Sequence, residues 1–558
     1  MTEILTSAQM RAVERAAIDS GQVSGLELME RAGQGVVAAV LTEWPHLAQG
    51  PYRRAVILCG PGNNGGDGYI VARLLAARGW RIDLFHYGDP AALPPDAQQA
   101  YARWSGQASP GRMTRLSVPV PTECEVAALK QAISTPPGAA GPDLIVDALF
   151  GTGLARSVTA LSQLLAAARI DAPAQADAQG PRVVAVDIPS GVCADSGRIL
   201  GGDDGVAVGA HLTVAFHVMK PGHVLAEGVG RCGKLVVAGI GLDTDPARDR
   251  RALENLHGLD PAEGVSRLGG LVAQCLDSAT LRPALGKTSG HKYTHGHALI
   301  LSGGAGRGGA ARLAARGALR IGAGLVTLGC PPDALTENAA RLDAVMLCPV
   351  ADAAALEQAL ADDRITALCL GPGLGLAARE AGLVAVALAA GRAMVLDADA
   401  LTLIARDPAL IKALHDRCVL TPHEGEFARL FPDLAEQLSA PAVTGPAYSR
   451  LDAVRASAAR AGCTVLLKGP DTVIAAPDGR VAVSAAVRDR AAPWLATAGS
   501  GDVLAGFIAG LMARGFAPFD AAGTGAYLHL EAALDFGPGL IAEDLPERLP
   551  RILRRSGV

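Results

Sequence analysis

The chain has 558 residues, and 50 Lys and Arg against 55 Asp and Glu leave a formal net charge of −5. This charge argues against a protein that binds nucleic acid mainly by electrostatic attraction, and a hydrophobic fraction of 50% argues against a disordered chain. At about 150 residues per domain, the length predicts roughly two to four domains.

Ten cysteines are spread singly along the chain, without a CxxC pair. This spacing gives no support to a zinc ribbon or a thioredoxin-type site, and it is typical of buried thiols in a reducing compartment. The first residues lack the basic flank and long apolar run of a signal peptide, and no stretch is apolar enough over its length to span a bilayer. We therefore expect a cytoplasmic protein that has no membrane partner.

The N-terminal half predicts a parallel α/β domain. Thr6, followed three residues later by Gln9, is a potential capping box ahead of an amphipathic helix. A second helix is expected over 69–78, ended by Gly79. Buried strands are expected at 55–59, 81–86, 143–146, 182–186 and 212–216. Continuous apolar strands that alternate with helices are typical of a parallel sheet covered on both faces.

The pattern lapses after Gly241, and a second α/β series begins near His291. We interpret the charged, proline-containing segment 243–264 as part of an interdomain linker. Strands of the second series are expected at 298–301, 325–328, 367–370, 393–396 and 464–467, followed by a hairpin over 472–483 that turns at 477–479. These boundaries divide the chain into a domain over 1–240, a linker over 241–279 and a domain over 280–558.

The densest motif is GPGNNGGDG at 60–68, between a predicted strand and a predicted helix. Its glycines allow positive φ and a close approach to a ligand, and the following helix offers free N–H groups to an anion. Gly60, Gly62 and Gly65 match the dinucleotide fingerprint, but Asp83 lies inside the next strand, whereas a Rossmann dehydrogenase needs an acid at its end. The Asn and Asp side chains instead indicate an amide-bearing ligand or an oxygen-ligated cation.

Two further clusters follow predicted strands. Asp147 begins the sequence DALFGTGL, and Asp187 begins DIPSG. Alone, Asp147 could cap a helix and Asp187 could brace a turn. Because ligands of doubly wound sheets bind beyond the carboxyl ends of the strands, we expect all three loops to converge on one crevice.

These motifs, with LTSAQM at 5–10 and LMERAG at 28–33, resemble the family of epimerases that act on hydrated NADH and NADPH. The resemblance covers about residues 1–240. It implies that the substrate contacts Asn63, Asn64, Gly65, Gly66, Asp67, Gly151, Thr152, Gly153, Leu154, Ala155, Arg156, Ser157 and Asp187. It also implies a K⁺ ion, held by Asn64, Asp147 and Ser190. Asp187 is the expected catalytic acid or base, because inversion at C6 needs reversible loss of hydroxide or a proton.

The C-terminal half carries TAGSGDVLAG at 497–506, ahead of an apolar helix. Gly499 and Gly501 free backbone N–H groups to form an anion nest, as phosphoryl transfer requires. Asp502 is placed to take the proton of an acceptor hydroxyl. One helix N-terminus contributes only about 0.3–1 kcal/mol per charge, so Mg²⁺ or further donors must share the task. Asp502 as an N-cap behind a flexible turn is the alternative.

Three other loops follow predicted strands: LKGPDT at 467–472, TPHEGEF at 421–427 and GPGLG at 371–375. Lys468 could grip a phosphate or a ribose, although a lysine in a turn is usually solvated. His423 is as consistent with a structural hydrogen bond as with a ligand contact. The run over 308–328 is expected to be a helix that packs on a strand.

Together these pieces resemble the ribokinase-like superfamily, and more closely its ADP- or ATP-dependent dehydratase of S-configured hydrated NAD(P)H, over about residues 280–558. The resemblance implies that Ala310, Gly373, His423 and Asp502 contact the hydrated nucleotide, with Asp502 as the base. It implies that the adenine nucleotide is held by Lys468, Gly469, Pro470, Asp471, Thr472 and Gly501. Mg²⁺ and ADP are the expected cofactor and phosphoryl donor, since bacterial members generally use ADP. Tyr293 follows Lys292 where the family usually has glycine.

We therefore predict an α/β protein with an N-terminal Rossmann-like doubly wound domain and a C-terminal ribokinase-like domain. The predicted function is bifunctional repair of hydrated NAD(P)H, by an isomerase that interconverts the R and S epimers and a lyase that dehydrates S while ADP becomes AMP and phosphate. We expect a homo-oligomer and no nucleic-acid partner. The alternatives are a small-molecule kinase with an N-terminal nucleotide-binding module, a non-enzymatic nucleotide sensor, against which Asp187 and Asp502 argue, and a Rossmann dehydrogenase.

Overall fold

The structure is a computed structural model that describes residues 2–49, 53–106, 111–134, 141–174, 180–242, 273–276, 285–287 and 290–558. The chain divides into two compact units. The N-terminal unit consists of Glu3–Val272 and Ala440–Ser449, and the C-terminal unit consists of Met1–Thr2, Ala273–Ser439 and Arg450–Val558. Most of the predicted linker lies outside the described residues.

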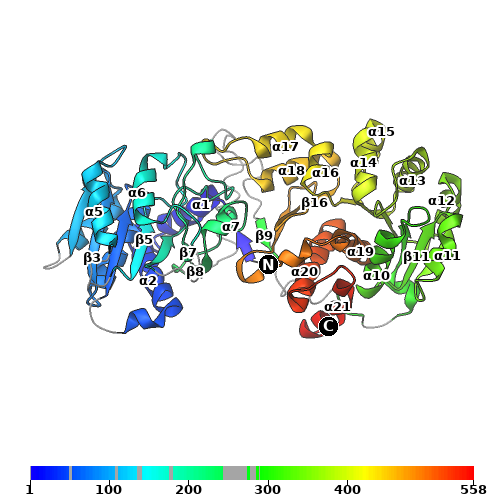
Figure 1. The fold of residues 1–558 in the computed structure, drawn as a ribbon, viewed down its shortest axis with the longest axis horizontal. Helices are drawn as coiled ribbons and strands as arrows, with labels where there is room; N and C mark the ends of the chain where they lie inside the picture. The colour runs from blue at the N-terminus through cyan, green and yellow to red at the C-terminus, as the bar shows by residue number, and fades with distance from the viewer. Residues whose placement is uncertain are drawn as a thin grey trace. The chain divides into compact units, whose positions relative to one another are not determined.

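The N-terminal unit is built on a seven-stranded sheet of order β4-β3-β2-β5-β6-β7-β8, in which every neighbouring pair is parallel (Figure 1). The strands are β2 (Arg54–Cys59), β3 (Arg81–Tyr87), β4 (Arg112–Leu116), β5 (Leu144–Ala148), β6 (Arg182–Val186), β7 (Leu212–Phe216) and β8 (Lys234–Ala238). The five predicted strands are confirmed. The edge strands β4 and β8 were missed. β4 (RMTRL) alternates with polar side chains and gives no continuous apolar run, whereas β8 (KLVVA) has such a run and was overlooked.

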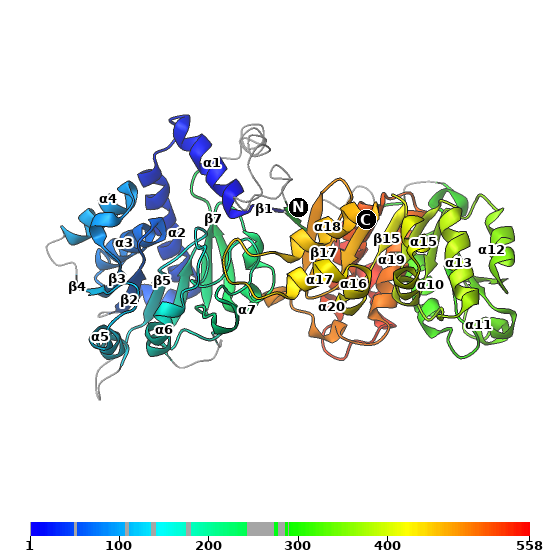
Figure 2. The ribbon, with the colours of Figure 1, turned by 90° about the horizontal axis from the view of Figure 1, so that it is seen from above.

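Helices lie on both faces of this sheet, as in a doubly wound fold (Figure 2). One hydrophobic cluster joins the sheet to α1 (Ser7–Asp19), α2 (Gly25–Glu43), α3 (Asn63–Ala76) and α4 (Pro95–Ser105). A second cluster joins it to α5 (Glu123–Ile133) and α6 (Ser162–Ala168), and the short α7 (Gly228–Arg231) precedes β8. The capping box of Thr6 and Gln9 is confirmed at the start of α1.

The glycine-rich motif differs from the prediction, because α3 begins at Asn63, inside it. None of its five glycines has positive φ. A Cβ on Gly65 would lie 2.0 Å from the carbonyl oxygen of Gly60, and a Cβ on Gly68 would lie 2.7 Å from Cys59 Sγ. Close packing therefore requires glycine at these positions, although a Cβ on Gly62 would meet nothing within 4 Å. The motif supplies ligand groups from the first turns of a helix instead of a free loop.

The C-terminal unit is built on a sheet of order β1-β9-β18-β17-β16-β15-β14-β13-β10-β11-β12. The strands are β1 (Thr2–Ile4), β9 (Ala273–Cys275), β10 (His297–Leu301), β11 (Leu325–Cys330), β12 (Met346–Pro349), β13 (Ala367–Leu370), β14 (Ala393–Leu396), β15 (Cys418–Leu420), β16 (Thr464–Leu467), β17 (Asp471–Ala475) and β18 (Val481–Ala485). The predicted strands and the antiparallel hairpin of β17 and β18 are confirmed. The strand expected ahead of TPHEGEF is β15. The strands β1, β9 and β12 were missed; each has three or four residues, and β9 lies inside the segment predicted to be a linker.

Its helices are α10 (Gly309–Arg320), α11 (Leu335–Ala339), α12 (Ala353–Leu360), α13 (Ala378–Ala389), α14 (Ala398–Arg406), α15 (Pro408–Lys412), α16 (Glu424–Leu430), α17 (Pro432–Ser439), α18 (Arg450–Ala461), α19 (Ser500–Ala513), α20 (Pro518–Phe536) and α21 (Asp544–Arg555). A cluster of buried apolar side chains joins α10, α19, α20 and α21 to the sheet. The predicted helix ahead of a strand within 308–328 is confirmed as α10 followed by β11.

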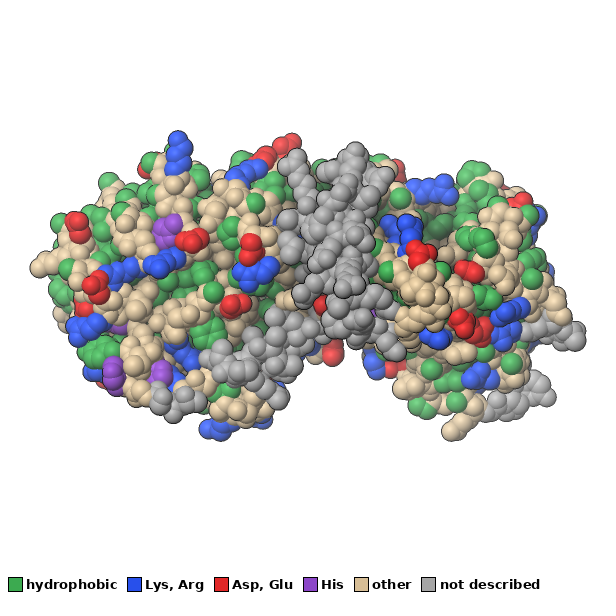
Figure 3. All heavy atoms as spheres, turned by 180° about the vertical axis from the view of Figure 1, so that it is seen from behind, with side chains coloured by type: hydrophobic (Ala, Val, Ile, Leu, Met, Phe, Trp, Pro, Cys, Tyr) green, Lys and Arg blue, Asp and Glu red, His purple; other side chains and the backbone are tan. Residues whose placement is uncertain are grey.

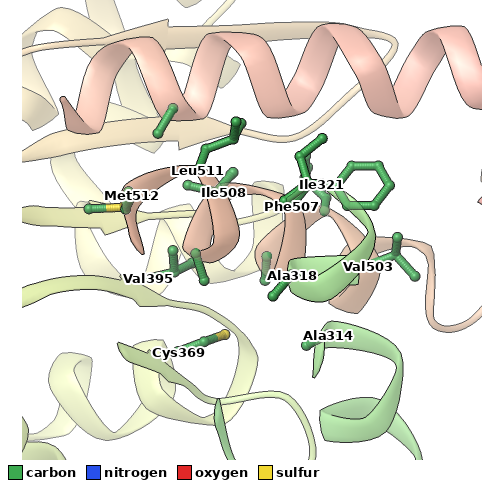
Figure 4. Close-up of a cluster of buried hydrophobic side chains, with 14 of the residues drawn as sticks. Ala314, Ala318, Ile321, Cys369, Val395, Val503, Phe507, Ile508, Leu511 and Met512 are labelled. Atoms are coloured by element: carbon green, nitrogen blue, oxygen red, sulfur yellow. The ribbon is translucent and has the colours of Figure 1, made fainter. Parts of the chain in front are cut away.

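Helices α10 and α19 approach each other closely through small residues (Figure 4). A Cβ on Gly506 would lie 2.1 Å from the carbonyl oxygen of Ala314, and one on Gly510 would lie 2.4 Å from Ile321 Cγ2. Phe507 and Ile508 are completely buried beside them. This packing fixes the position of the N-terminus of α19, which carries the TAGSGD motif.

On the face of the molecule in Figure 3, the described Lys and Arg side chains are interspersed with Asp and Glu. Over the part of the chain that the structure describes, no helix is both long and apolar enough to cross a membrane.

Candidate active sites

In the N-terminal unit, the predicted loops meet at the carboxyl ends of β2, β5 and β6, which are neighbours in the sheet. The strand order reverses between β2 and β5, the switch point at which doubly wound sheets bind ligands. A cavity of about 650 Å³ opens there. The predicted site residues that line it are Asn63, Asn64, Asp67, Gly151, Thr152, Gly153, Leu154, Ala155, Arg156 and Asp187. The predicted convergence of the three loops is confirmed.

Three residues that were predicted to contact the substrate, Gly65, Gly66 and Ser157, are not among the residues that line the cavity. A Cβ on Gly66 would lie 2.5 Å from Met29 Sδ, and Gly65 packs on Gly60. Both glycines therefore allow α3 to pack closely against its neighbours. The hydroxyl of Ser157 bonds to the Thr159 hydroxyl and accepts a hydrogen bond from the Thr159 N–H.

Asp187 directly follows β6 and adopts φ of +64°, which is rare for a residue other than glycine. Its Oδ1 lies 2.9 Å from Lys220 Nζ, and its Oδ2 accepts a hydrogen bond from the Thr152 N–H at 3.3 Å. Burial acts to raise the pKa of Asp187, but the Lys220 ammonium outweighs it and holds that pKa below its ordinary value. Asp187 is therefore an ionised carboxylate that faces the cavity.

Lys220 was not identified from the sequence. Its side chain is 1% exposed, and Nζ also donates to the carbonyl oxygen of Phe216 at 3.0 Å. The ring of His223 bonds through Nε2 to the carbonyl oxygen of Asp187 at 2.8 Å. The signal that could have found this group is the sequence Lys-Pro-Gly shortly after β7, a fourth polar cluster near a strand end.

Asp147 lies inside β5, one residue before its end, so the helix-cap interpretation of this residue is wrong. Both carboxylate oxygens are completely buried and bonded to Ser190, whose N–H donates at 2.8 Å and whose hydroxyl donates at 2.7 Å. The Ser190 hydroxyl also accepts from the Phe150 N–H. Asn64 Oδ1 lies 2.9 Å from where a Cβ on Gly151 would stand, and its Nδ2 is buried with no hydrogen-bond partner in the described structure.

Beside Asp187, the cavity is lined by the carboxyl groups of Asp67, Glu14 and Asp96. Asp67, from α3, is buried, and both this burial and the nearby carboxylates of Asp187 and Glu14 raise its pKa well above the ordinary value. Glu14, from α1, also lines the cavity and belongs to no motif identified in the sequence. Burial raises the pKa of Glu14 to about 7, against the lowering influence of Lys220.

In the C-terminal unit, β16, β15, β14, β13 and β10 are neighbouring parallel strands. Predicted site residues follow four of them: Lys468 after β16, His423 after β15, Gly373 after β13 and Ala310 after β10. Gly499, with φ of +88°, is the N-cap of α19, and Gly501 and Asp502 lie in its first turn. The interpretation of Asp502 as an N-cap is therefore wrong. In this first turn, the Ser500 N–H donates to the carbonyl oxygen of Thr497 and the Val503 N–H to that of Gly499.

Lys468, at the end of β16, is held between carboxylates. Its Nζ lies 2.7 Å from Asp397 Oδ1 and 3.8 Å from Glu426 Oε2, and 3.6 Å from where a Cβ on Gly501 would stand. Lys468 therefore brings the LKGPDT loop close to the start of α19 and its TAGSGD motif. Burial, with a contribution from Asp397, raises the pKa of Asp502 to about 6.

The remainder of the LKGPDT loop is tied down by Arg450. Its guanidinium donates to the Lys468 carbonyl oxygen at 2.7 Å and lies 3.6 Å from Asp471 Oδ1. The Thr472 hydroxyl donates to the Gly469 carbonyl oxygen at 2.7 Å. Pro470 closes the turn by accepting from the Ala486 N–H. These bonds fix the loop without involving the Lys468 ammonium.

The other predicted contacts fall into two groups. Ala310 and Gly373 lie together, since a Cβ on Gly373 would stand 3.4 Å from Ala310 Cβ. His423 is the N-cap of α16, and its Nδ1 accepts from the Gly425 N–H at 3.0 Å, as the structural interpretation predicts. Its side chain is still 56% exposed. The ring of Tyr293, the departure from the family pattern, has Lys292 Nζ at 5.3 Å and Arg364 Cζ at 5.0 Å from its centroid.

Comparison with known sequences assigns each half separately. Residues 25–222 match the family described as YjeF-related protein N-terminus, and residues 298–555 match the family described as NAD(P)H-hydrate dehydratase. The NAD(P)H-hydrate epimerase of Rhodobacter capsulatus is 43% identical over 43% of this chain and 100% of its own. The solved ADP/ATP-dependent NAD(P)H-hydrate dehydratase of Bacillus subtilis, co-crystallised with ATP and Mg²⁺, is 27% identical, with a TM-score of 0.42 over 51% of this chain and 99% of that one.

A full-length relative joins the two halves in the same order. The bifunctional NAD(P)H-hydrate repair enzyme Nnr of Moorella thermoacetica is 34% identical over 99% of this chain and 96% of its own length. The resemblance identified from the motifs is confirmed for both halves, and so is the predicted fold class of a Rossmann-like unit and a ribokinase-like unit. The chain belongs to the family of bifunctional NAD(P)H-hydrate repair enzymes.

Proposed function

We propose that this chain repairs hydrated NADH and NADPH by two reactions. The N-terminal unit inverts the configuration at C6 of the hydrated ring, and the C-terminal unit removes water from the S epimer with consumption of ADP. The fusion has a chemical reason, because a dehydratase that accepts only S would leave R to accumulate. The observation that carries the proposal is the presence of two separate sites, each with its own carboxylate, Asp187 or Asp502, at a predicted ligand loop.

In the N-terminal unit, the hydrated nicotinamide ring would lie in the cavity against Asn63–Asp67. Residues 151–157 follow β5 and would lie along the dinucleotide phosphates, where Arg156 adds a positive charge at the rim. Asp187 is a suitable base because Lys220 keeps it ionised and the Thr152 N–H orients it.

The K⁺ ion of the family fits the oxygen atoms of Asn64, Asp147 and Ser190. The hydrogen-bond donors to the buried Asp147 carboxylate are neutral, two from Ser190 and the N–H of Leu149. Such a carboxylate is stabilised by a cation, and K⁺ prefers hard oxygen ligands. When bound, the ion would neutralise this carboxylate and fix the loop after β5. Among the described residues, no cluster of three or more His, Cys, Asp or Glu side chains is placed to hold a transition metal instead.

In the C-terminal unit, the C6 hydroxyl would attack the β-phosphate of ADP while Asp502 takes its proton. The new O–P bond forms as the bond from phosphorus to AMP breaks, and the resulting phosphate ester then leaves C6 as inorganic phosphate with loss of the C5 proton. The N-terminus of α19 faces the charge that develops on the transferred group, and Lys468 adds a cation beside Gly501. Mg²⁺ would arrive mainly with the nucleotide phosphates.

We further propose that ADP is preferred over ATP, that residues 468–472 and Gly501 hold it, and that Ala310, Gly373 and the exposed side of His423 contact the hydrated nucleotide. All ten cysteines are free thiols, which supports a reducing compartment such as the cytoplasm. A homo-oligomer remains part of the proposal and is tested by light scattering of the purified chain.

The deciding assay gives the full chain each purified epimer of hydrated NADH with Mg²⁺, K⁺ and either ADP or ATP. We expect recovery of dihydronicotinamide absorbance from both epimers, with one AMP and one phosphate formed for each ADP consumed. Replacement of K⁺ by choline should slow repair of R and leave repair of S unchanged. Stable phosphorylation of a sugar or vitamin alcohol, without recovery of dihydronicotinamide, would instead identify a small-molecule kinase.

A further inference from the structure

Glu14 is a titratable side chain in the N-terminal cavity that neither the motifs nor the mechanism above uses. It lies in the middle of α1, beside the buried Val13, and lines the cavity together with Arg11, one turn earlier. The same cavity is also lined by Asp187, from the loop after β6, and by Asp67, from α3. Carboxyl groups thus enter one pocket from three different elements.

The position of α1 relative to Asp187 is fixed by hydrogen bonds at the start of the helix. The Ser7 N–H and hydroxyl both donate to Asp195 Oδ1, at 2.6 and 2.8 Å. The Leu5 N–H donates to the carbonyl oxygen of Met219 at 3.1 Å. Asp195 lies in the segment that follows Asp187, and Met219 directly precedes Lys220. The helix that carries Glu14 is therefore attached to both segments that carry the Asp187–Lys220 pair.

Inversion at C6 needs proton transfer on both faces of the ring. Hydroxide leaves one face and is a poor leaving group unless it is protonated, while water adds to the opposite face and must lose a proton. One carboxyl group cannot reach both faces of a ring held in a single orientation. Asp187 can serve one face, so a second acid or base must stand on the other side of the substrate.

The charges around Glu14 match this second role. The groups that face it are Asp187, Lys220, Asp67 and Arg11, and Asp96 and Arg156 also line the cavity. Burial raises the pKa of Glu14 to about 7, whereas Lys220 holds the pKa of Asp187 below its ordinary value. Two carboxyl groups whose pKa values are pushed apart are a typical acid–base pair. Burial and the neighbouring carboxylates raise the pKa of Asp67 well above its ordinary value, which favours its neutral form.

We propose that Glu14 is the second catalytic acid–base residue of the epimerase site and acts on the face of C6 opposite Asp187. This inference rests on the proposed epimerase function. In one direction, protonated Glu14 donates its proton as the C6–O bond breaks, so that water leaves and the ring nitrogen lone pair forms a C6=N1 iminium. Water then adds to the other face and gives its proton to Asp187. The reverse direction exchanges the two roles, and exchange with solvent restores the single proton that the pair shares.

The test is inversion of the R epimer by the full chain without ADP, so that dehydration is silent, corrected for spontaneous inversion without protein. Glu14→Gln should lower kcat by about 10²–10⁴-fold while KM and the melting temperature stay near the wild-type values. The wild-type rate should fall as pH rises above about 7, the pKa of Glu14, and this limb should be absent in Glu14→Gln. Asp19→Asn, at an exposed carboxylate of the same helix, is the matched control and should behave as wild type.

A second variant tests the same role without relying on one substitution. Glu14→Ala should be slow, and added formate, which can enter the vacated space, should restore part of its rate but none of the rate of Asp187→Asn. The proposal is overturned if Glu14→Gln inverts R at the wild-type rate, if only its KM changes, if its alkaline limb persists, or if formate has no effect. A wild-type chain that leaves R unchanged would be a distinct result, since it would remove the epimerase function itself.

Discussion

The two sites of this chain solve different chemical problems with different parts of the protein. In the N-terminal cavity, the reactive groups are side chains from separate elements, and the central carboxylate Asp187 is paired with the buried Lys220. In the C-terminal site, the main donors are backbone N–H groups at the start of α19, assisted by Lys468 and one carboxylate, Asp502. An inversion must move protons on two faces, whereas phosphoryl transfer needs fixed donors and a single base.

Both sites nevertheless follow one architectural rule, since each lies at the carboxyl ends of neighbouring parallel strands. The difference lies in how charge is stabilised. A buried ion pair depends on both partners, so it fails when one is removed. A helix N-terminus is a property of the backbone and survives most side-chain changes. The comparison therefore predicts that substitutions in the two sites affect stability and activity in different proportions.

The largest effect is expected for the single base of the C-terminal site. Asp502→Asn should lower ADP-dependent dehydration of the S epimer by about 10²–10⁴-fold, because no other group takes the hydroxyl proton. Inversion of R to S, followed by chromatography, should be unchanged, and so should the melting temperature. The control is Asp520→Asn, an exposed carboxylate in the first turn of α20. A variant Asp502→Asn that dehydrates S normally would contradict the assignment.

The next effect should separate stability from activity in the N-terminal site. Asp187→Asn tolerates the positive φ but leaves Lys220 as an unpaired buried cation, which should cost about 3–5 kcal/mol of unfolding free energy. The double variant Asp187→Asn/Lys220→Met should recover much of that stability in urea denaturation, yet neither variant should invert R. If Asp187→Asn has the same free energy of unfolding as the wild type, the ion pair does not stabilise the fold.

A smaller effect tests the packing that positions the N-terminus of α19. Gly506→Ala should destabilise the C-terminal unit by about 1–3 kcal/mol, because its Cβ would collide with the Ala314 carbonyl oxygen. Dehydration should weaken and inversion should not. Gly382→Ala, in α13, is the matched control: its Cβ would make an ordinary contact 3.6 Å from Ala353 Cβ, so it should be neutral or slightly stabilising. Equal melting curves for both variants would refute the close-packing argument.

The smallest effect is a pH dependence of dehydration. Burial raises the pKa of Asp502 to about 6, and the base must be ionised, so kcat/KM for S should fall about tenfold per pH unit below that value. Between pH 7 and 8 it should be flat. Inversion should show a decline on the alkaline side instead, so the two activities of one chain should have opposite limbs. A dehydration profile that is level down to pH 5 would contradict the role of Asp502.

Most of the strands and many residues of the two sites could be predicted from the sequence, because the ligand loops contain recognisable motifs of glycine and polar residues after apolar strands. Buried strands such as β6 and β7 were predicted at their full bounds, and Asp187, Lys468 and Asp502 follow strand ends or glycine turns. The start of α3 was wrong, because glycines needed for helix packing resemble glycines needed for a turn. Glu14 and Lys220 were missed. Each belongs to the site because it lies close to residues that are far away in the sequence, such as Asp187, and local sequence spacing does not show such contacts.

The most direct test of two independent sites in one chain is complementation between variants. Repair of pure R hydrated NADH with ADP, Mg²⁺ and K⁺ is followed by dihydronicotinamide absorbance for the wild type, for Asp187→Asn, for Asp502→Asn and for an equimolar mixture of the two variants. The account predicts fast recovery with the wild type and with the mixture, and no fast recovery with either variant alone. A mixture that stays as slow as the single variants, or a single variant as fast as the wild type, would contradict it.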